Sequence, residues 1–93
     1  IGLLTNLEFL RLSENPLNGS IPPEVGRLRS LNLLYLHAND LHGCIPYSVG
    51  NLSNLASLYL HNNQLSGSIL SDIGNLSNLV ELDMKNNNLR SIF

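Results

Sequence analysis

A period of 24 residues runs through the chain and limits what it can fold into more than any other feature of the sequence. Apolar residues recur at fixed places in each period, and a unit of this length is too short to bury them by itself. Units of this kind stack side by side and share one core, so we predict a solenoid. The recurring apolar columns are Leu4, Leu28, Leu52 and Leu76; Leu7, Leu31, Leu55 and Leu79; Leu10, Leu34, Leu58 and Leu82; Leu12, Leu36, Leu60 and Met84; and Leu17, Leu41, Leu65 and Leu89.

Each unit also contains a short segment in which apolar and variable residues alternate, such as Leu10-Arg11-Leu12 in the first unit. This alternation has the period of a β-strand with one buried face. Parallel stacking of these strands would align their leucines into one continuous hydrophobic row. The sequence therefore predicts a parallel sheet along one side of the solenoid.

An asparagine follows each predicted strand, at the point where the chain must turn inside the stack. Its amide group can donate and accept hydrogen bonds, so it can satisfy backbone groups of its own turn and of the neighbouring turn. We predict a structural ladder rather than a binding role for these residues, which are Asn15, Asn39, Asn63 and Asn87.

The second half of each unit carries a distinctive pattern, seen in Asn15-Pro-Leu-Asn-Gly-Ser-Ile-Pro22 and Leu41-His-Gly-Cys-Ile-Pro46. This pattern resembles the plant-type leucine-rich repeat of receptor-like kinases and receptor-like proteins. The resemblance implies a concave parallel sheet, short helical or 3-10 turns on the convex side, and a second short strand on the flank. It also implies a twisted rather than flat horseshoe.

We expect one repeat array over residues 1–93, with residues 1–3 as the tail of a preceding repeat. Residues 4–27, 28–51 and 52–75 would be full repeats, and residues 76–93 a truncated one. No cysteine-paired cap flanks the array, so we expect part of a longer ectodomain with an exposed core at each end. Leu70 replaces the third proline, and the fourth unit ends in Leu89-Arg-Ser-Ile-Phe93, so we expect an irregular second strand near the C-terminus.

The variable strand positions should form columns on the concave face, because neighbouring parallel strands lie about 4.8 Å apart. The first two columns hold the candidate ligand-binding residues Phe9, Leu33, Ser57 and Glu81, and Arg11, Tyr35, Tyr59 and Asp83. The third column begins with Ser13, and its other members are the candidates His37, His61 and Lys85. A fourth column holds Glu14, Ala38, Asn62 and Asn86.

Tyrosine and histidine in the middle units should form a patch, with Arg11 on one side and Glu81, Asp83 and Lys85 on the other. Aromatic residues with polar tips are common anchors of protein interfaces. The alternative is that the Tyr-Leu-His sequence recurs only because the repeats duplicated. Four strands span roughly 14 Å, which would hold four or five residues of an extended peptide.

The resemblance implies a protein- or peptide-recognition module in the extracellular ligand-sensing domain of a plant receptor-like kinase, with a secreted peptide, a protein or a co-receptor ectodomain as partner. Three alternatives share the repeat: a receptor-like protein without a kinase, a secreted inhibitor of pathogen wall-degrading enzymes, and a truncated product that does not signal. We expect the extracellular face of the plasma membrane, and a role in signalling or plant defence. The chain has no signal peptide or apolar run of about 20 residues, so membrane anchoring would need other segments.

Three Asn-x-Ser sequons, at Asn18, Asn51 and Asn75, fall outside the predicted concave columns. They are candidate glycosylation sites if the protein passes through the secretory pathway.

Other functional classes find little support. Five Lys and Arg against seven Asp and Glu, without a basic run, disfavour a nucleic-acid partner. An open sheet face lacks the enclosed pocket that general acid–base catalysis requires, so we predict no enzyme and no cofactor. We also predict no metal site: His37 and His61 would supply only two neighbouring ligands, and Cys44 lies on another edge, where an inert thiol is expected.

Overall fold

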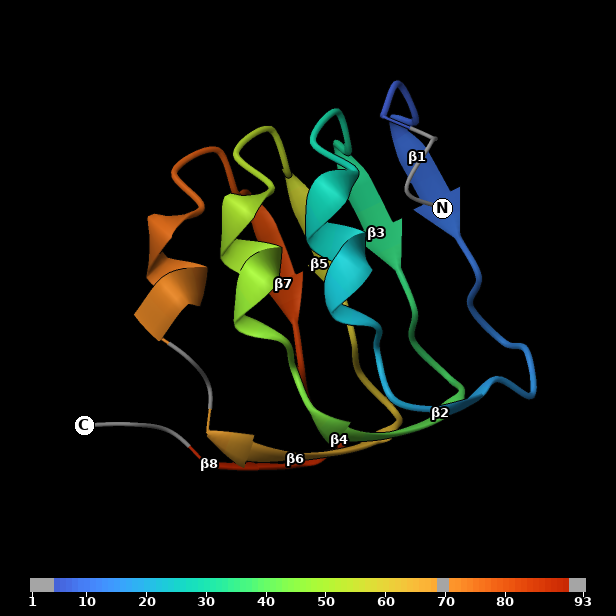
Figure 1. Cartoon of the computed structure of the whole chain (residues 1–93). Helices are drawn as coiled ribbons and strands as arrows, with labels where there is room; N and C mark the ends of the chain where they lie inside the picture. The colour runs from blue at the N-terminus through green and yellow to red at the C-terminus, as the bar shows by residue number, and fades with distance from the viewer. Residues whose placement is uncertain (1–4, 69–70, 91–93) are drawn as a thin grey trace.

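The structure is a computed structural model that describes residues 5–68 and 71–90. Its first sheet contains one three-residue strand from each unit, in the parallel order β1-β3-β5-β7 (Figure 1). The strands are β1 (Phe9–Arg11), β3 (Leu33–Tyr35), β5 (Ser57–Tyr59) and β7 (Glu81–Asp83). Phe9 pairs with Leu33, and Leu33 with Ser57, so residues 24 positions apart lie side by side. This register confirms the parallel sheet predicted from the period.

A second parallel sheet lies along the flank, at the bottom of Figure 1. It consists of β2 (Asn18–Gly19), β4 (Asp40–Cys44), β6 (Gln64–Ser68) and β8 (Asn88–Arg90). Here Gly43 pairs with Leu65, only 22 positions further on, so each strand is displaced by two residues relative to its neighbour. Two residues of strand correspond to about 6.6 Å, and this displacement inclines the flank strands to the direction of stacking.

The expectation of an irregular second strand near the C-terminus was wrong as far as Arg90. β8 pairs with β6 from Ser66↔Asn88 to Ser68↔Arg90, as the other flank strands pair. The displaced register explains this, because the pairing residues of β8 precede the departure from the repeat. The departing residues 91–93, and Leu70, lie outside the described residues.

In residues 5–68 and 71–90, three 3-10 helices cover the side of the molecule opposite the first sheet (Figure 1). They are η1 (Pro23–Arg27), η2 (Tyr47–Asn51) and η3 (Ser71–Asn75). Pro22 and Pro46 precede η1 and η2 in extended conformation, with φ of −69° and −66°, which is the φ that the proline ring imposes. Leu28 and Leu52 end these helices and are fully buried, so the next apolar column begins where each helix stops.

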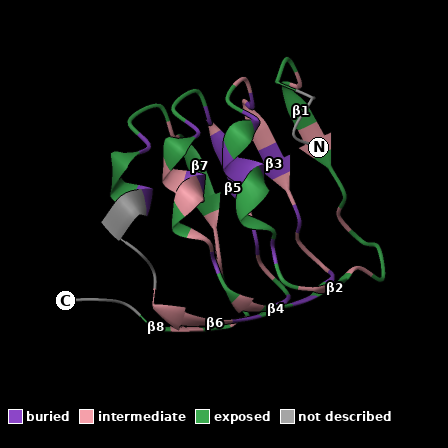
Figure 2. Cartoon of the chain, viewed as in Figure 1, coloured by how far each residue is buried: buried purple, intermediate pink, exposed green. Residues whose placement is uncertain are grey.

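The core lies between the two sheets and the helices, and buried residues line the inside of all three (Figure 2). The first sheet contributes Leu34 and Leu58, the flank sheet Leu41 and Leu65, and the helices mainly Val25, Val49 and Ile73. These residues are all nearly inaccessible to water. The two sheets, the helical turns and this shared core confirm the predicted leucine-rich-repeat solenoid.

The asparagines after β3, β5 and β7 hydrogen-bond to the turn of their own unit and to that of the preceding unit, while the side chain of Asn15 after β1 donates only within its own turn among the described residues. Asn63 Nδ2 donates to the carbonyl oxygens of Leu60 at 3.2 Å and of Leu36 at 2.9 Å, while its Oδ1 accepts from the Leu41 backbone N–H at 3.0 Å. Asn39 and Asn87 make the same kinds of contact. These bonds join successive units at a place where buried backbone groups would otherwise be unpaired.

Candidate ligand-binding surface

The first sheet has one face toward the core and one face away from the helices, which we call the concave face. Alternation along each strand separates them: Leu34 and Leu36 are buried, while Tyr35 and His37 are half-buried on the concave face. The strand register then brings each variable residue beside the equivalent residue of the next unit. The eight candidate ligand-binding residues in the strands follow this arrangement. The other three come after the strands: His37 stacks on His61, and the Lys85 carbonyl oxygen accepts a hydrogen bond from the backbone of Asn62, next to His61.

Four aromatic rings form the centre of the concave face. Tyr35 and Tyr59 stack with centroids 4.3 Å apart and planes 3° from parallel. His37 and His61 stack in the same way, at 4.4 Å and 13°. The two pairs meet edge to face, with His37 5.6 Å from Tyr35 and from Tyr59. Each ring is thus held by two neighbours or more, which fixes a stiff surface of ring edges, hydroxyl groups and imidazole nitrogens.

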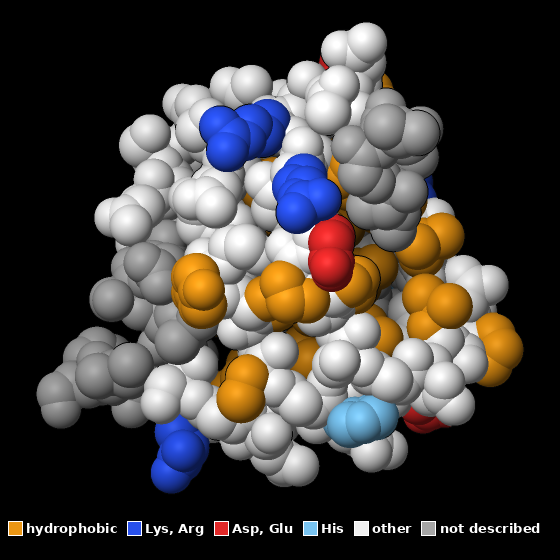
Figure 3. All heavy atoms as spheres, in the orientation of Figure 1, with side chains coloured by type: hydrophobic (Ala, Val, Ile, Leu, Met, Phe, Trp, Pro, Cys, Tyr) orange, Lys and Arg blue, Asp and Glu red, His pale blue; other side chains and the backbone are white. Residues whose placement is uncertain are grey.

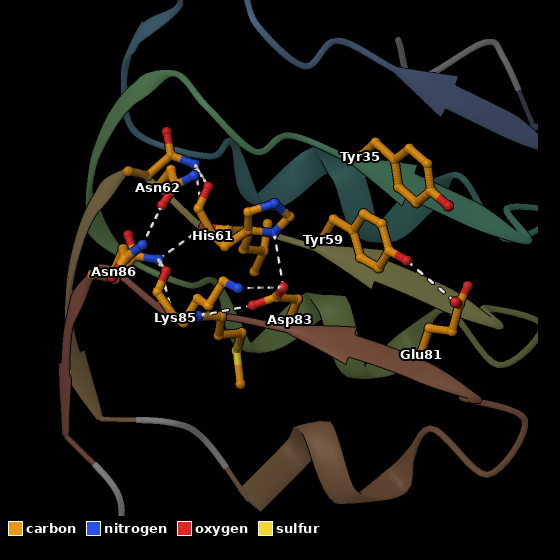
Figure 4. A network of polar contacts seen from close by, with 12 residues as sticks. Tyr35, Tyr59, His61, Asn62, Glu81, Asp83, Lys85 and Asn86 are labelled. Atoms are coloured by element: carbon orange, nitrogen blue, oxygen red, sulfur yellow. Dashed lines mark hydrogen bonds and ion pairs between the residues drawn. The ribbon is translucent and has the colours of Figure 1, made fainter.

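Hydroxyl groups connect the tyrosine pair to Glu81 on β7, and Figure 4 shows the contact from Tyr59. Tyr59 Oη donates to Glu81 Oε2 at 3.2 Å. Ser57 Oγ lies 3.0 Å from Glu81 Oε1 and 3.3 Å from Tyr35 Oη. Because a hydroxyl group has one proton, Ser57 donates to the carboxylate and accepts from Tyr35. Glu81 is therefore joined to the aromatic centre rather than standing apart at its margin.

Arg11 bounds the aromatic centre on the opposite side. Its guanidinium carbon lies 5.6 Å from the ring centroid of Phe9 and 6.0 Å from that of Tyr35, within the range of a cation–π contact. Phe9 is 53% exposed, and Leu33 beside it is half-buried. This side of the concave face combines an exposed cation with apolar surface.

Comparison with known proteins identifies the repeat. The family model described as Leucine Rich Repeat matches residues 6–28 and 54–76. The ectodomain of the Arabidopsis receptor kinase HAESA, solved with an N-terminally extended IDA peptide hormone, is 42% identical, with a TM-score of 0.88. A TDR receptor structure is 44% identical (TM-score 0.93), and a plant ice-binding protein is 35% identical (TM-score 0.90). The chain carries the leucine-rich repeat and resembles plant-type leucine-rich-repeat proteins.

It resembles part of a receptor-like kinase ectodomain, as its sequence suggested. The aligned region covers 91% of this chain but 14% of HAESA, and 95% of this chain but 15% of the TDR receptor and 28% of the ice-binding protein. The leucine-rich-repeat chain therefore spans a minor part of each relative. The comparison with curated protein sequences gives no match.

The histidine pair of this leucine-rich-repeat chain lies against two charged residues of the last strand. His61 Nδ1 lies 3.5 Å from Asp83 Oδ2 without hydrogen-bond geometry, and Lys85 Nζ lies 4.0 Å from the same oxygen. Within the described residues, Nδ1 of His37 is buried without a hydrogen-bond partner. Burial lowers the pKa of His37, and the neighbouring His61 lowers it further, against the opposing effects of Glu14 and Asp83.

Burial also raises the pKa of the Tyr59 phenol, and the Glu81 carboxylate that accepts its hydrogen bond raises it further. A raised pKa keeps the phenol protonated, so Tyr59 is a lasting hydrogen-bond donor on the concave face.

Several other residues lie away from the concave face. The sequon residue Asn18 is exposed on β2, and Asn51 and Asn75 are exposed at the ends of η2 and η3. All three side chains are therefore accessible, and their glycosylation stays a prediction. Cys44 is a free thiol on β4, beside a cleft of about 380 Å³ that the exposed Tyr47 also lines. Figure 3 shows the helix side of the molecule, where both charged and hydrophobic side chains reach the surface.

A contact between two asparagines on the concave face was not among the predictions from the sequence. Asn86 Nδ2 donates to Asn62 Oδ1 at 2.6 Å, which links the ends of the last two strands. Recurrence of asparagine in this column was the only available signal.

Over residues 5–68 and 71–90, no three His, Cys, Asp or Glu residues gather as a metal site would require. Among the described residues, no helix has the length and apolar character of a membrane span.

Proposed function

We propose that this chain is a protein- or peptide-recognition module, part of the extracellular ligand-sensing domain of a plant leucine-rich-repeat receptor-like kinase, and that it binds through the concave face. The contacting residues would be Phe9, Arg11, Leu33, Tyr35, His37, Ser57, Tyr59, His61, Glu81, Asp83 and Lys85. HAESA supports this assignment, since its ectodomain was solved with a peptide hormone.

The observation that carries the proposal is the block of four stacked rings. A side chain that must be immobilised on binding costs about 0.5–1.5 kcal/mol, and rings already held by their neighbours avoid much of this cost. Tyrosine also provides a large apolar body together with a hydroxyl group, which suits it as an interface anchor.

Membership of a larger receptor would put the chain outside the cell, where the partner would be a secreted peptide, a protein or a co-receptor ectodomain. Glycans on Asn18, Asn51 and Asn75 would then project from the flank and helix sides and leave the concave face open. A receptor-like protein without a kinase, a secreted inhibitor and a truncated product share the repeat. A kinase-coding segment in the same gene would favour the first assignment over these.

Removal of two tyrosines tests the binding surface. The immobilised chain is exposed to secreted peptides and proteins from plant cell-culture medium, and retained molecules are identified by mass spectrometry and then titrated. Tyr35→Ala combined with Tyr59→Ala should weaken binding by roughly fivefold or more, as loss of an interface anchor does. Tyr47→Ala, on the opposite side and 75% exposed, is the control and should bind as the native chain does.

All variants should melt within a few degrees of the native chain. Equal affinity of the double variant and the native chain would exclude the concave face as the binding surface.

A further inference from the structure

Two charged residues of the concave face, Arg11 and Glu81, have no ion-pair partner among the described residues. Arg11 on β1 makes contact with two aromatic rings, and among the described residues no carboxylate forms an ion pair with it. Glu81 on β7 accepts hydrogen bonds from Ser57 and Tyr59, and within the same ranges no cation pairs with it. Asp83, in contrast, has Lys85 and His61 beside it. One unpaired cation and one unpaired anion therefore stand at opposite sides of the aromatic centre.

Both charged groups also lie toward the same end of the strands. The guanidinium group of Arg11 reaches the ring of Phe9, which is in register with Leu33, Ser57 and Glu81. The tyrosine hydroxyl groups point the same way, because they meet Ser57 and Glu81. A straight path from Arg11 to Glu81 thus crosses Leu33, the tyrosine hydroxyl groups and Ser57.

The length of this path sets the spacing of a complementary ligand. Three gaps between parallel strands amount to roughly 14 Å, and an extended peptide advances about 3.3 Å per residue. Residues four positions apart in such a peptide are about 13 Å apart and project from the same face. A dipolar peptide with this spacing would place one charge against each unpaired group.

We propose that the concave face selects an extended peptide whose acidic side chain meets Arg11 and whose basic side chain, four residues away, meets Glu81. The inference rests on the proposed function and adds the charge and spacing of the ligand to it. An apolar residue between the two charges would lie over Leu33 and the tyrosine edges. The hydroxyl groups around Glu81 hold its carboxylate in place, which reduces the ordering cost of pairing with a cation.

Short synthetic peptides with blocked ends test this proposal by NMR titration of the isotope-labelled chain. The probe is Asp-Ser-Val-Ser-Arg, acetylated and amidated so that it has no terminal charge. Asp-Ser-Val-Ser-Gln and Gln-Ser-Val-Ser-Arg each carry one charge, and Ser-Val-Asp-Arg-Ser carries adjacent charges. An exposed ion pair typically changes affinity by roughly two- to fivefold, so the probe should bind more tightly than each of the other three by about this factor.

Two variants assign each charge to its partner. Arg11→Gln should weaken the two Asp-containing peptides of the spaced set and leave Gln-Ser-Val-Ser-Arg unchanged. Glu81→Gln should weaken the two Arg-containing peptides of that set and leave Asp-Ser-Val-Ser-Gln unchanged. Arg27→Gln and Glu24→Gln, both exposed on η1, remove the same charges from the opposite side and should change nothing.

The proposal is overturned if the peptide with adjacent charges binds as tightly as the probe, if either variant affects all peptides equally, or if the native chain does not bind the probe. Tyr35→Ala separates this proposal from the proposed function. If Tyr35→Ala weakens the peptides and the charge variants do not, only the charge pattern is wrong. If none of these variants weakens a bound peptide, the binding surface itself is wrong.

Discussion

Four residues of the concave face have left-handed backbone conformation, one after each strand of the first sheet. They are Glu14, Ala38, Asn62 and Asn86, with φ between 57° and 59°. This conformation costs most L-residues about 1–2 kcal/mol, and asparagine tolerates it best among residues with a side chain. The turn that carries the chain out of each strand therefore strains the first two units more than the last two. The column also contains alanine and glutamate, so its residue types did not reveal the backbone requirement.

His37 should make the stability of the fold depend on pH. Burial and the adjacent His61 lower its pKa in the folded chain below the ordinary value of 6.5. Between the lowered pKa and 6.5 the unfolded chain binds more protons than the folded chain. The contribution of His37 is thus fully present above pH 6.5 and is lost as the pH falls toward its folded-state pKa. Urea unfolding measured at several values between pH 7.5 and pH 5 should show this loss.

Substitution of His37 tests whether this residue causes the pH dependence of stability. His37→Gln should flatten the pH dependence over that range, since it removes the group whose protonation differs between the two states. His42→Gln, which alters an exposed residue on β4, should retain the native profile. An unchanged profile in His37→Gln would assign the pH dependence to other groups.

For single residues, the sequence predicted which side chains lie side by side in the first sheet but not which hydrogen bonds they form. The 24-residue period was enough to place Tyr35 beside Tyr59 and His37 beside His61, because equal positions are in register in the first sheet. The link from Tyr59 to Glu81 depends on side-chain rotamers, which packing in three dimensions selects. The sequence therefore assigned Glu81 to a charged margin, whereas it is part of the hydroxyl network.

At the scale of elements, the close packing of η1 against η2 depends on Gly26, which has no side chain. A Cβ atom on Gly26 of η1 would lie 2.6 Å from the carbonyl oxygen of Ser48 and 2.7 Å from its Cβ on η2. Such distances require a backbone shift. Gly26→Ala should therefore lower the free energy of unfolding by about 1–3 kcal/mol, as overpacking in a close-packed region does. Chemical denaturation measures this change.

The equivalent glycine of η3 is a matched control. A Cβ atom on Gly74 would meet nothing within 4 Å, so Gly74→Ala should leave stability nearly unchanged. Equal losses for the two variants would show that the loss in Gly26→Ala does not come from the close approach of η1 and η2.

The flank sheet shows where sequence-based prediction of elements stops. The family resemblance carried by the Leu-x-Gly-x-Ile pattern implied a second strand, and Gly43 and Gly67 have the positive φ, 80° and 83°, that favours glycine there. The displacement of two residues between neighbours was not predictable, since it depends on how the inclined turns fit together. Because of that displacement, the residues of β8 that pair with β6 precede residues 91–93, where the last unit departs from the repeat.

At the scale of the whole molecule, stability comes from contacts between successive units, because each unit of a solenoid packs mainly on its neighbours. The structure follows this rule: a middle unit has a partner on both sides, while β1 and β7 each pair on one side only. Leu58 in the third unit is 0% exposed, and Leu82 at the same position of the fourth unit is 43% exposed. Two leucines of the same column thus differ in burial, because Leu58 has a neighbouring unit on both sides and Leu82 has one on one side only.

Truncation of these two leucines should measure how much of the fold depends on the middle of the stack. Leu58→Ala should cost about 2–5 kcal/mol, as loss of a buried leucine does. A domain has only about 5–15 kcal/mol in total, so this variant should melt far below the native chain or fail to fold. Leu82→Ala removes a side chain that is already partly in water and should lower the melting temperature much less. Thermal unfolding followed by circular dichroism compares the two, and equal losses would mean that the core row does not run through β5 as the register places it.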